Sequence, residues 1–219
     1  MHLSSKDITQ FQKKVWDFYK RNKRDLLWRE TTNPYHILLS EIMLQQTQVA
    51  RVERKYPEFL NQFPNFKTLA KAPRREVIKT WQGMGYNRRA IALHEIAKKV
   101  MREYGGDLPR DPELLIQFPG IGRATAASIS AFAWNMPTVF VETNIRCVMI
   151  HHFFKRAQKV KEEDILEAVR KTLPKKRARE WYWALMDYGT RLATQVPNPN
   201  KKSARYRVQS VFEGSNREM

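Results

Sequence analysis

Hydrophobic residues along this chain recur at the three-to-four-residue spacing of amphipathic helices. The first such helix is predicted over residues 7–22, and its apolar face carries Ile8, Phe11, Val15, Phe18 and Tyr19. A second helix is predicted after the Asn33-Pro34 break, with a core face of Ile37, Leu38, Ile42, Met43 and Val49. Further helices are predicted over residues 51–62, 66–71, 74–82, 88–104, 112–118, 123–133, 145–155, 162–172 and 178–192. The chain is therefore predicted to be all-α.

Short segments that contain glycine or proline separate the predicted helices. Gly83-Met84-Gly85 indicates a turn, and Gly105-Gly106 is typical of a helix end. Thr138–Val141 is a β-branched run that favours an extended segment. The sequence contains neither an internal repeat nor a low-complexity stretch.

The strongest local signal is a hairpin that leads directly into a helix of small residues, Phe118-Pro119-Gly120-Ile121-Gly122-Arg123-Ala124-Thr125-Ala126-Ala127. Pro119 fixes one backbone dihedral, and Gly120 and Gly122 are predicted to adopt conformations that other side chains forbid. The free N–H groups of the hairpin and of the first helical turn then point together toward an anion. The segment predicts a phosphate-binding hairpin, although such a turn alone more often only joins two helices.

The charge of the chain supports a polyanionic partner. Lysine and arginine total 40 against 22 acidic residues, which gives a net charge of +18 and a sequence pI near 10.1. The positive excess is spread over the whole length, so the sequence predicts a basic globular protein that binds nucleic acid. No apolar run approaches the roughly 20 residues that span a bilayer, and the N-terminus lacks the apolar core of a signal peptide. We therefore expect an intracellular, cytoplasmic protein without a membrane partner, associated with the nucleoid if the cell is prokaryotic.

Cys147 is the only cysteine of the chain. A single cysteine excludes an internal disulfide and any four-cysteine metal or iron–sulfur site within these 219 residues.

Several motifs together resemble the helix–hairpin–helix superfamily of base-excision DNA glycosylases, most closely its adenine DNA glycosylase branch. The motifs are Pro34-Tyr35, the string Leu39–Val49, Gly83–Tyr86, the hairpin and Ala184–Gly189. The resemblance runs from about Phe11 to Gly189. It implies two helical lobes with DNA bound across the cleft: residues 30–134 form one lobe, and residues 1–29 with 135–219 form the other. It also implies a monomer that acts on double-stranded DNA containing a mispaired or damaged base.

Glu41 is the first candidate catalytic residue. Ile42, Met43 and Leu44 follow it, so an apolar wall could keep its carboxyl dry enough to raise its pKa. A purine anion is a poor leaving group and needs a proton. The resemblance gives Glu41 this role, protonating the departing base and handling water. Taken alone, a glutamate early in a helix is more often solvated.

Glu142 is the second candidate. It precedes Thr143 and Asn144, which are good capping residues for the following helix, so we expect a carboxylate kept ionised by the helix end. An ionised carboxylate would stabilise or attack an oxocarbenium-like sugar. The family ordinarily has aspartate here, and the additional methylene of glutamate could displace the oxygens by about an ångström. A Glu142 that only caps the helix remains the alternative.

Ala124 stands where bifunctional members of the family carry a lysine that forms a Schiff base and cuts the strand. Alanine has no amine, so the sequence predicts a monofunctional glycosylase that leaves an intact abasic strand.

The resemblance also implies a set of DNA contacts, because a side chain inserted into the gap offsets part of the unstacking of a flipped nucleotide. The predicted contacts are Gln45, Gln46, Tyr86, Arg88, Gly120, Gly122, Arg123, Ala124 and Thr125, with Arg89 as a further candidate for a phosphate contact. Members of the family also bind a monovalent cation, Na⁺ or K⁺, through main-chain oxygens that would be those of Ile116, Phe118 and Ile121.

The sequence departs from the family in two places. Relatives carry four cysteines of a [4Fe–4S] cluster after the Asp187–Gly189 motif, whereas Ala193 stands near the first cysteine position here. We therefore expect no cluster, no required cofactor, and a second lobe closed by Trp181, Trp183, Tyr206 and Phe212. The C-terminal domain that senses 8-oxoguanine in adenine glycosylases is not expected either, because the chain ends at Met219.

These departures leave the excised base open. The small side chain of Ala124 favours a purine, so the leading hypothesis is adenine opposite guanine or 8-oxoguanine. Uracil, thymine opposite guanine, or hypoxanthine is the alternative. Two other classes remain at this point: a helix–hairpin–helix protein that binds damaged DNA without chemistry, and a basic protein associated with RNA or chromatin.

Overall fold

The computed structural model describes residues 3–207, and these form eleven α-helices, two short 3₁₀ helices and no strand. The all-α prediction is thus confirmed for this part of the chain, in which no helix is both long and apolar enough to cross a bilayer. In chain order the elements are α1 (Ser5–Asn22), η1 (Leu27–Arg29), α2 (Pro34–Leu44), α3 (Val49–Gln62), α4 (Phe66–Lys71), α5 (Arg74–Thr80), α6 (Arg88–Glu103), α7 (Pro112–Leu115), α8 (Arg123–Trp134), α9 (Thr143–Phe153), α10 (Glu162–Thr172), α11 (Ala178–Gln195) and η2 (Pro199–Lys202).

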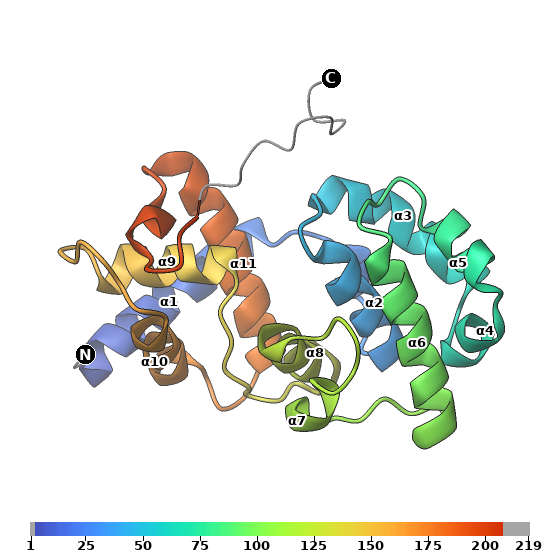
Figure 1. Ribbon diagram of the computed structural model, residues 1–219. Coiled ribbons are helices and arrows are strands. Elements are labelled where there is room, and N and C mark those ends of the chain that lie inside the picture. Colours follow the sequence, from blue (N-terminus) through green and yellow to red (C-terminus); the bar gives the residue numbers. More distant parts are fainter. Residues whose placement is uncertain (1–2, 208–219) are drawn as a thin grey trace.

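The helices gather around two hydrophobic clusters. The first is built mainly from η1 and α2–α6, and the second mainly from α1 and α9–α11. Figure 1 shows the two groups side by side, with α7 and α8 between them. The lobe boundaries predicted at residues 29/30 and 134/135 stay a prediction.

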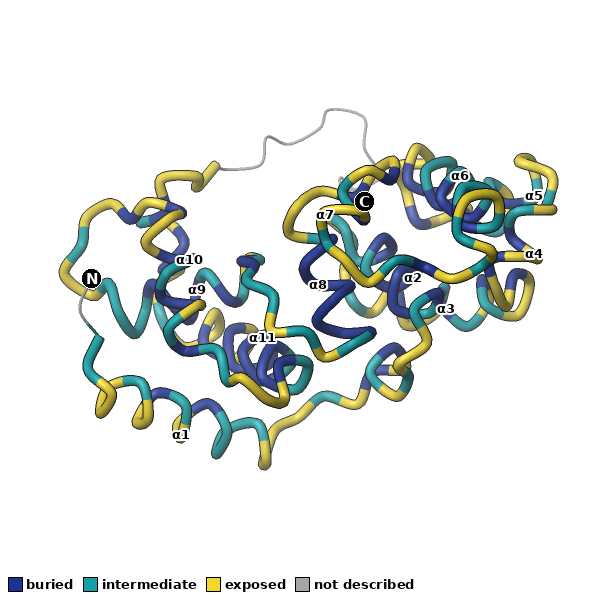
Figure 2. The backbone as a smooth tube through the Cα atoms, turned by 90° about the horizontal axis from the view of Figure 1, so that it is seen from below, coloured by how far each residue is buried: buried dark blue, intermediate teal, exposed yellow. Residues whose placement is uncertain are grey.

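Helix α8 contributes to both clusters because its side chains are small. Ala126 and Ile129 belong to the first cluster, whereas Ala127 and Ala131 belong to the second. The helix is buried over most of its length, as its dark colour in Figure 2 shows. Its N-terminal end is exposed, so the hairpin that precedes it is accessible at the surface.

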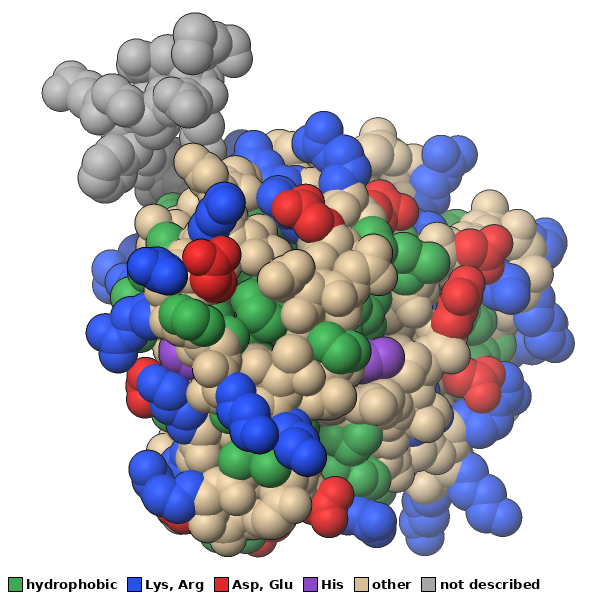
Figure 3. All heavy atoms as spheres, turned by 90° about the vertical axis from the view of Figure 1, so that its right-hand side faces the viewer, with side chains coloured by type: hydrophobic (Ala, Val, Ile, Leu, Met, Phe, Trp, Pro, Cys, Tyr) green, Lys and Arg blue, Asp and Glu red, His purple; other side chains and the backbone are tan. Residues whose placement is uncertain are grey.

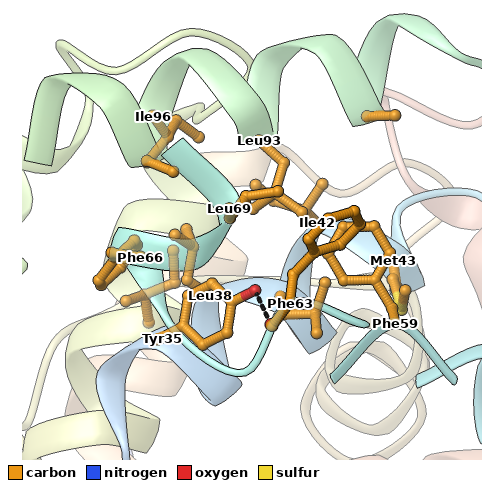
Figure 4. Close-up of a cluster of buried hydrophobic side chains, with 14 of the residues drawn as sticks. Tyr35, Leu38, Ile42, Met43, Phe59, Phe63, Phe66, Leu69, Leu93 and Ile96 are labelled. Carbon is orange, nitrogen blue, oxygen red and sulfur yellow. Dashed lines mark hydrogen bonds between the residues drawn. The ribbon is translucent and has the colours of Figure 1, made fainter. Parts of the chain in front are cut away.

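The first cluster fixes α2, the helix that carries Glu41. Tyr35, Leu38, Ile42 and Met43 of α2 face side chains of α3, α4 and α6 (Figure 4). The Tyr35 hydroxyl donates a hydrogen bond of 2.5 Å to the backbone oxygen of Phe63, so the one polar atom of this ring is satisfied inside the cluster. The buried face leaves the opposite side of α2 for Glu41.

The second cluster brings α9 and α11 into close contact at Gly189. A Cβ atom at this position would lie 2.5 Å from the backbone oxygen of Asn144, which real structures do not tolerate. The glycine therefore permits the close approach of α11 to the first turn of α9, the turn that Glu142 begins.

The end of the second lobe is closed by a segment that the sequence did not predict to be ordered. Val160 and Ser203 form an isolated bridge, and the Asn200 side chain donates to the backbone oxygen of Thr143 at 3.2 Å. Of the four residues predicted to close this lobe, Trp181 is buried and Trp183 is half-buried, but Tyr206 is exposed and Phe212 lies outside the described residues. The expectation for Tyr206 was wrong, because η2 takes the place against α9.

Candidate active site

A pocket of about 300 Å³ lies where the two clusters meet. Its floor and walls come from η1 and the residues before it, α2, the loop after α2, α8, the loop before α9, and α11. Four aromatic side chains line it, namely Trp28, Phe132, Phe140 and Trp183. Both candidate carboxylates also line it, so residues 101 positions apart in the sequence share one site. The pocket combines flat apolar walls with two acidic groups.

Glu41 lies on the side of α2 that faces the pocket, where it is half-buried. Its Oε2 accepts a hydrogen bond from the Ser128 hydroxyl of α8. Burial and, to a smaller extent, the charge of the nearby Glu142 raise the pKa of Glu41, whereas the Ser128 hydrogen bond lowers it, and the result is a pKa of about 7. The carboxyl is thus poised to hold and release a proton near neutral pH, but Ile42 and Met43 face the first cluster, so the burial comes from the packing of α2 against the other walls of the pocket and not from these sequence neighbours.

Glu142 is itself the N-cap of α9, whereas the sequence favoured Thr143 or Asn144. Its side chain accepts a hydrogen bond of 2.8 Å from the Ile145 amide and one of 3.3 Å from the Asn144 side chain. These donors lower the pKa of Glu142, but burial raises it by more, so the pKa lies above its ordinary value. The helix end therefore opposes protonation, as expected, without fully offsetting the burial.

Arg24, Arg29 and Asp187 form a second charged group in the same pocket that sequence reasoning missed. Asp187 is 1% exposed and accepts from Arg24 Nε at 2.6 Å and from Arg29 Nη1 and Nη2 at 2.8 and 2.9 Å. Arg24 and Arg29 line the pocket, and the Arg29 guanidinium lies 5.6 Å from the Trp183 ring centroid. Isolated arginines near the N-terminus carry no signal of this role, because their partner follows about 160 residues later.

The hairpin retains the open helix end that the sequence predicted. Gly120 has a φ of +77°, which favours glycine, and a Cβ there would meet the Ala92 Cβ at 3.2 Å. Gly122 has an ordinary φ of −90°, so the expectation of a special conformation was wrong for this residue. A Cβ at Gly122 would point into open space, and no side chain caps the helix that starts there. The free amides of the first turn of α8 therefore face an accessible surface.

The three main-chain oxygens proposed for a cation lie in this hairpin. The Phe118 oxygen accepts a hydrogen bond of 3.3 Å from the Ile121 amide. The oxygens of Ile116 and Ile121 accept none from the described residues, so they remain free for an ion that prefers carbonyl ligands. Within residues 3–207, no group of three or more His, Cys, Asp or Glu side chains could hold a metal ion.

Gln45 and Gln46 lie in a loop, not on the helix predicted to continue to Val49. Helix α2 ends at Leu44, and Gln46 adopts a left-handed φ of +54°. The Gln45 side chain donates to the backbone oxygen of Gly120 at 3.2 Å and to the Thr125 hydroxyl at 3.4 Å. This loop is therefore attached to the hairpin, and Gln46 beside it is exposed.

Tyr86 is 49% exposed and has a left-handed φ of +49°. The exposed Arg88 lies over its ring at 5.7 Å. Arg89 is only 6% exposed, so the expectation that it meets a phosphate was wrong. The Arg89 guanidinium instead donates to six oxygens of the two loops, those of Ile42, Met43, Gln45, Thr47, Met84 and Gly85. Arg89 therefore connects the loop that carries Gln45 and Gln46 with the turn that carries Tyr86.

We expect Arg89→Lys to lower the free energy of unfolding by about 2–3 kcal/mol, because an ammonium group cannot reach the oxygens of both loops and buried carbonyls lose their donors. Arg88→Lys is the matched control. Since Arg88 is exposed, we expect a change within about 0.5 kcal/mol there. Urea denaturation of both variants measures the difference, and equal stabilities would contradict the role of Arg89.

Basic side chains are spread over the surface of the first lobe on the side of α4 and α5. Figure 3 shows Lys and Arg side chains spread over the face on the side of α4 and α5, mixed with fewer acidic ones. Exposed members of these helices and of the segments beside them are Lys67, Lys71, Arg74, Arg75 and Lys79. The charge is distributed over the molecule, as the sequence indicated.

The chain is similar to known proteins in both sequence and fold. The family model described as HhH-GPD superfamily base excision DNA repair protein matches residues 39–175, a stretch that contains Glu41, the hairpin and Glu142. The chain is similar to the adenine DNA glycosylase of Mycobacterium tuberculosis, with 39% identity over 141 residues that cover 64% of this chain and 46% of that protein. It is also similar to the adenine DNA glycosylase of Buchnera aphidicola, with 32% identity over 181 residues, or 82% and 52% of the two chains. The chain thus spans about half the length of these relatives.

Three further proteins match this chain over most of their own length. The thymine/uracil-DNA glycosylase of Methanothermobacter thermautotrophicus is 29% identical over 190 residues, which cover 83% of this chain and 86% of that protein. The solved structure of a thermostable thymine-DNA glycosylase matches with a TM-score of 0.75 and 27% identity, over 84% of this chain and 86% of the other. A non-covalent endonuclease III–DNA complex shares the fold at a TM-score of 0.71 and 19% identity, over 84% and 85% of the two chains.

Proposed function

We propose that this chain, which belongs to the HhH-GPD superfamily of base excision DNA repair proteins, is a monofunctional DNA glycosylase that acts on duplex DNA. The observation that carries the proposal is the meeting of Glu41 and Glu142 in one pocket with aromatic walls, beside a hairpin with free amides. The resemblance found in the sequence is confirmed at the level of the family. Activity, substrate and partner are our inferences for this chain.

In the proposed reaction, Glu41 donates its proton to the flipped base while the bond between base and sugar breaks. The electron pair of that bond leaves with the base, which departs neutral, and the sugar becomes an oxocarbenium-like cation. Water then attacks the sugar carbon and returns a proton to Glu41. A pKa of about 7 supports both roles, because the carboxyl can give and take a proton at neutral pH.

Glu142 would face the cationic sugar. The Ile145 amide fixes one of its oxygens at the start of α9, so the carboxyl has a defined place in the pocket. The donors of the helix end favour its charged form and oppose the burial that raises its pKa. A fixed negative charge is what an oxocarbenium-like transition state requires.

The remaining groups support extrusion and binding of a nucleotide. Aromatic rings such as Trp183 and Phe140 offer stacking surfaces for a flat base, and Ala124 adds neither bulk nor an amine. The absence of an amine at Ala124 is the basis for a glycosylase without efficient strand cleavage. We assign a Na⁺ or K⁺ ion to the oxygens of Ile116, Phe118 and Ile121. We assign the DNA contacts to residues of the two loops, the hairpin and the start of α8, namely Gln45, Gln46, Tyr86, Arg88, Gly120, Gly122, Arg123, Ala124 and Thr125. We further propose that the protein is intracellular and acts as a monomer.

Adenine opposite guanine or 8-oxoguanine is the substrate we favour, because the adenine DNA glycosylase of Mycobacterium tuberculosis shares 39% identity with the matched part of this chain. The second candidate is a uracil or thymine opposite guanine. It is favoured by the thymine/uracil-DNA glycosylase relative, of which this chain covers 86%. The two candidates differ in the base that must fit between the same aromatic walls.

The proposal is tested by single-turnover incubation with end-labelled duplexes that carry A:8-oxoguanine, A:G, U:G, T:G or hypoxanthine:T. Each reaction is divided between alkaline and neutral work-up. We expect a cleaved strand only after alkali, since the enzyme leaves an abasic site, and we expect it first for adenine. Product from U:G or T:G instead would select the second candidate. Binding without product on any duplex would overturn the enzyme and favour a protein that only recognises damaged DNA.

A further inference from the structure

The hydroxyl of Ser128 lies between two acceptors, one of which is the Glu41 carboxyl. Ser128 is 3% exposed on α8, and it donates a hydrogen bond to Glu41 Oε2 across the contact between α2 and α8. The same oxygen lies 3.0 Å from the backbone oxygen of Thr125, in a position to donate to it instead. A hydroxyl has one proton, so it can serve only one of these acceptors at a time, while its oxygen can also accept.

The two acceptors match the two protonation states of Glu41. When Glu41 is ionised, the Ser128 hydroxyl donates to the carboxylate. When Glu41 is protonated, its own O–H can donate to the Ser128 oxygen, provided that the Ser128 proton turns to the Thr125 oxygen. Both states then keep a hydrogen bond between Ser128 and Glu41, and only the torsion of one O–H bond changes.

We propose that Ser128 is a positioning residue for Glu41, holding the carboxyl as a donor to its ionised form and as an acceptor from its acid form. The inference rests on the proposed function, in which Glu41 gives a proton to the base and regains one from water. The proton that leaves Glu41 goes to the departing base, and the Ser128 proton turns from Thr125 toward the new carboxylate. The proton returned by water restores the first arrangement.

The charged groups around Glu41 fix the sign of the expected effect. Glu142 faces it from the start of α9, and Arg24 and Arg29 line the same pocket in their ion pairs with Asp187. Burial and Glu142 both raise the pKa of Glu41, whereas the Ser128 hydrogen bond lowers it. Removing the hydroxyl therefore raises the pKa of Glu41 and keeps the proton on the carboxyl at higher pH.

The first measurement follows the Glu41 carboxyl by carbon NMR in protein labelled at glutamate side-chain carbons, with Glu41→Gln used to assign the signal. In Ser128→Ala we expect the pKa of Glu41 to rise by about one pH unit, because the hydrogen bond to the charged carboxylate is stronger than the one from the neutral acid and its loss destabilises the ionised form more. Ser130→Ala is the matched control, because Ser130 is equally buried on α8 but donates to Arg110 and Ala126 oxygens away from the pocket. We expect it to leave the pKa unchanged. An unchanged pKa in Ser128→Ala would overturn the proposal.

The second measurement is the single-turnover rate of base release against pH. At pH 8.5, where most of the Glu41 population is ionised, we expect Ser128→Ala to react up to about tenfold faster than the unaltered protein. At pH 5.5 we expect equal rates within about twofold. A variant that is slower at every pH would contradict the role of Ser128 in setting protonation. A shift in the Glu41 pKa with no base release from any protein would contradict the proposed function alone, because the NMR titration does not depend on activity.

Discussion

Replacing Glu41 by glutamine is expected to slow base release in single turnover by a factor of about 10²–10⁴, the usual contribution of a positioned acid–base group. Glutamine keeps the shape of the side chain but has no proton to give to the departing base. The expected loss is in the chemical step, so affinity for a duplex with the mispaired base should change little. Rate and affinity are measured on the same labelled duplex.

Glu53→Gln is the matched control for this substitution, because Glu53 is an exposed residue of α3 away from the pocket. We expect its rate to stay within about twofold. Glu41→Gln also removes a buried group that can carry charge, so we expect its thermal unfolding to occur no lower than in the unaltered protein. A Glu41→Gln protein that retains more than a tenth of the rate would rule out Glu41 as the general acid.

The pH dependence of the unaltered protein follows from the same carboxyl. The pKa of Glu41 is raised to about 7, so the acid form that the reaction requires predominates below pH 7. As the pH rises through 7, this form is lost and the rate should fall, approaching tenfold for each further pH unit. In Glu41→Gln this fall in rate above pH 7 should be absent. If the fall persists in the variant, it must come from the titration of another group.

The helices themselves could be predicted from the sequence because their stability comes from an apolar face with helical spacing. The C-terminal end of α2 could not be predicted in this way. Its apolar pattern continues to Val49, yet the helix stops at Leu44, where the Arg89 guanidinium from α6 takes the carbonyl oxygens of Ile42 and Met43. Arg89 lies more than 40 residues further along the chain, so the helix propensities of the residues around Leu44 could not predict that the helix ends there.

The site divides in the same way between local and distant causes. The open end of α8 was visible in the glycines before it. A raised pKa of Glu41 was expected from Ile42, Met43 and Leu44, but Ile42 and Met43 pack in the first cluster, so the burial that raises it comes from distant elements. The hydrogen bond between Ser128 and Glu41 could not be predicted, because it depends on how closely α2 and α8 approach each other. Resemblance supplied the catalytic candidates, whereas only the packed structure supplied the groups that tune them.

Replacing Asp187 by asparagine is expected to lower the free energy of unfolding by about 3–5 kcal/mol, since it leaves buried arginine charge without its partner. Arg29 carries most of this effect, because its side chain is 7% exposed while that of Arg24 is 33% exposed and is partly screened by water. Domains of this kind are stable by about 5–15 kcal/mol, so the loss is a large share. Urea denaturation at pH 7 measures it.

Asp25→Asn is the matched control for this change. Asp25 belongs to the same N-terminal segment, but it is exposed, and its ion pair with Lys23 spans 3.7 Å at the surface. We expect that substitution to alter stability by less than about 1 kcal/mol. If Asp187→Asn were no more destabilised than Asp25→Asn, the buried ion pairs would not hold the segment in place. A large difference would mean that Asp187 on α11 holds the segment with Arg24, Trp28 and Arg29 in place as one wall of the pocket. A residue of the second lobe would then help to build the pocket to which the first lobe contributes Glu41.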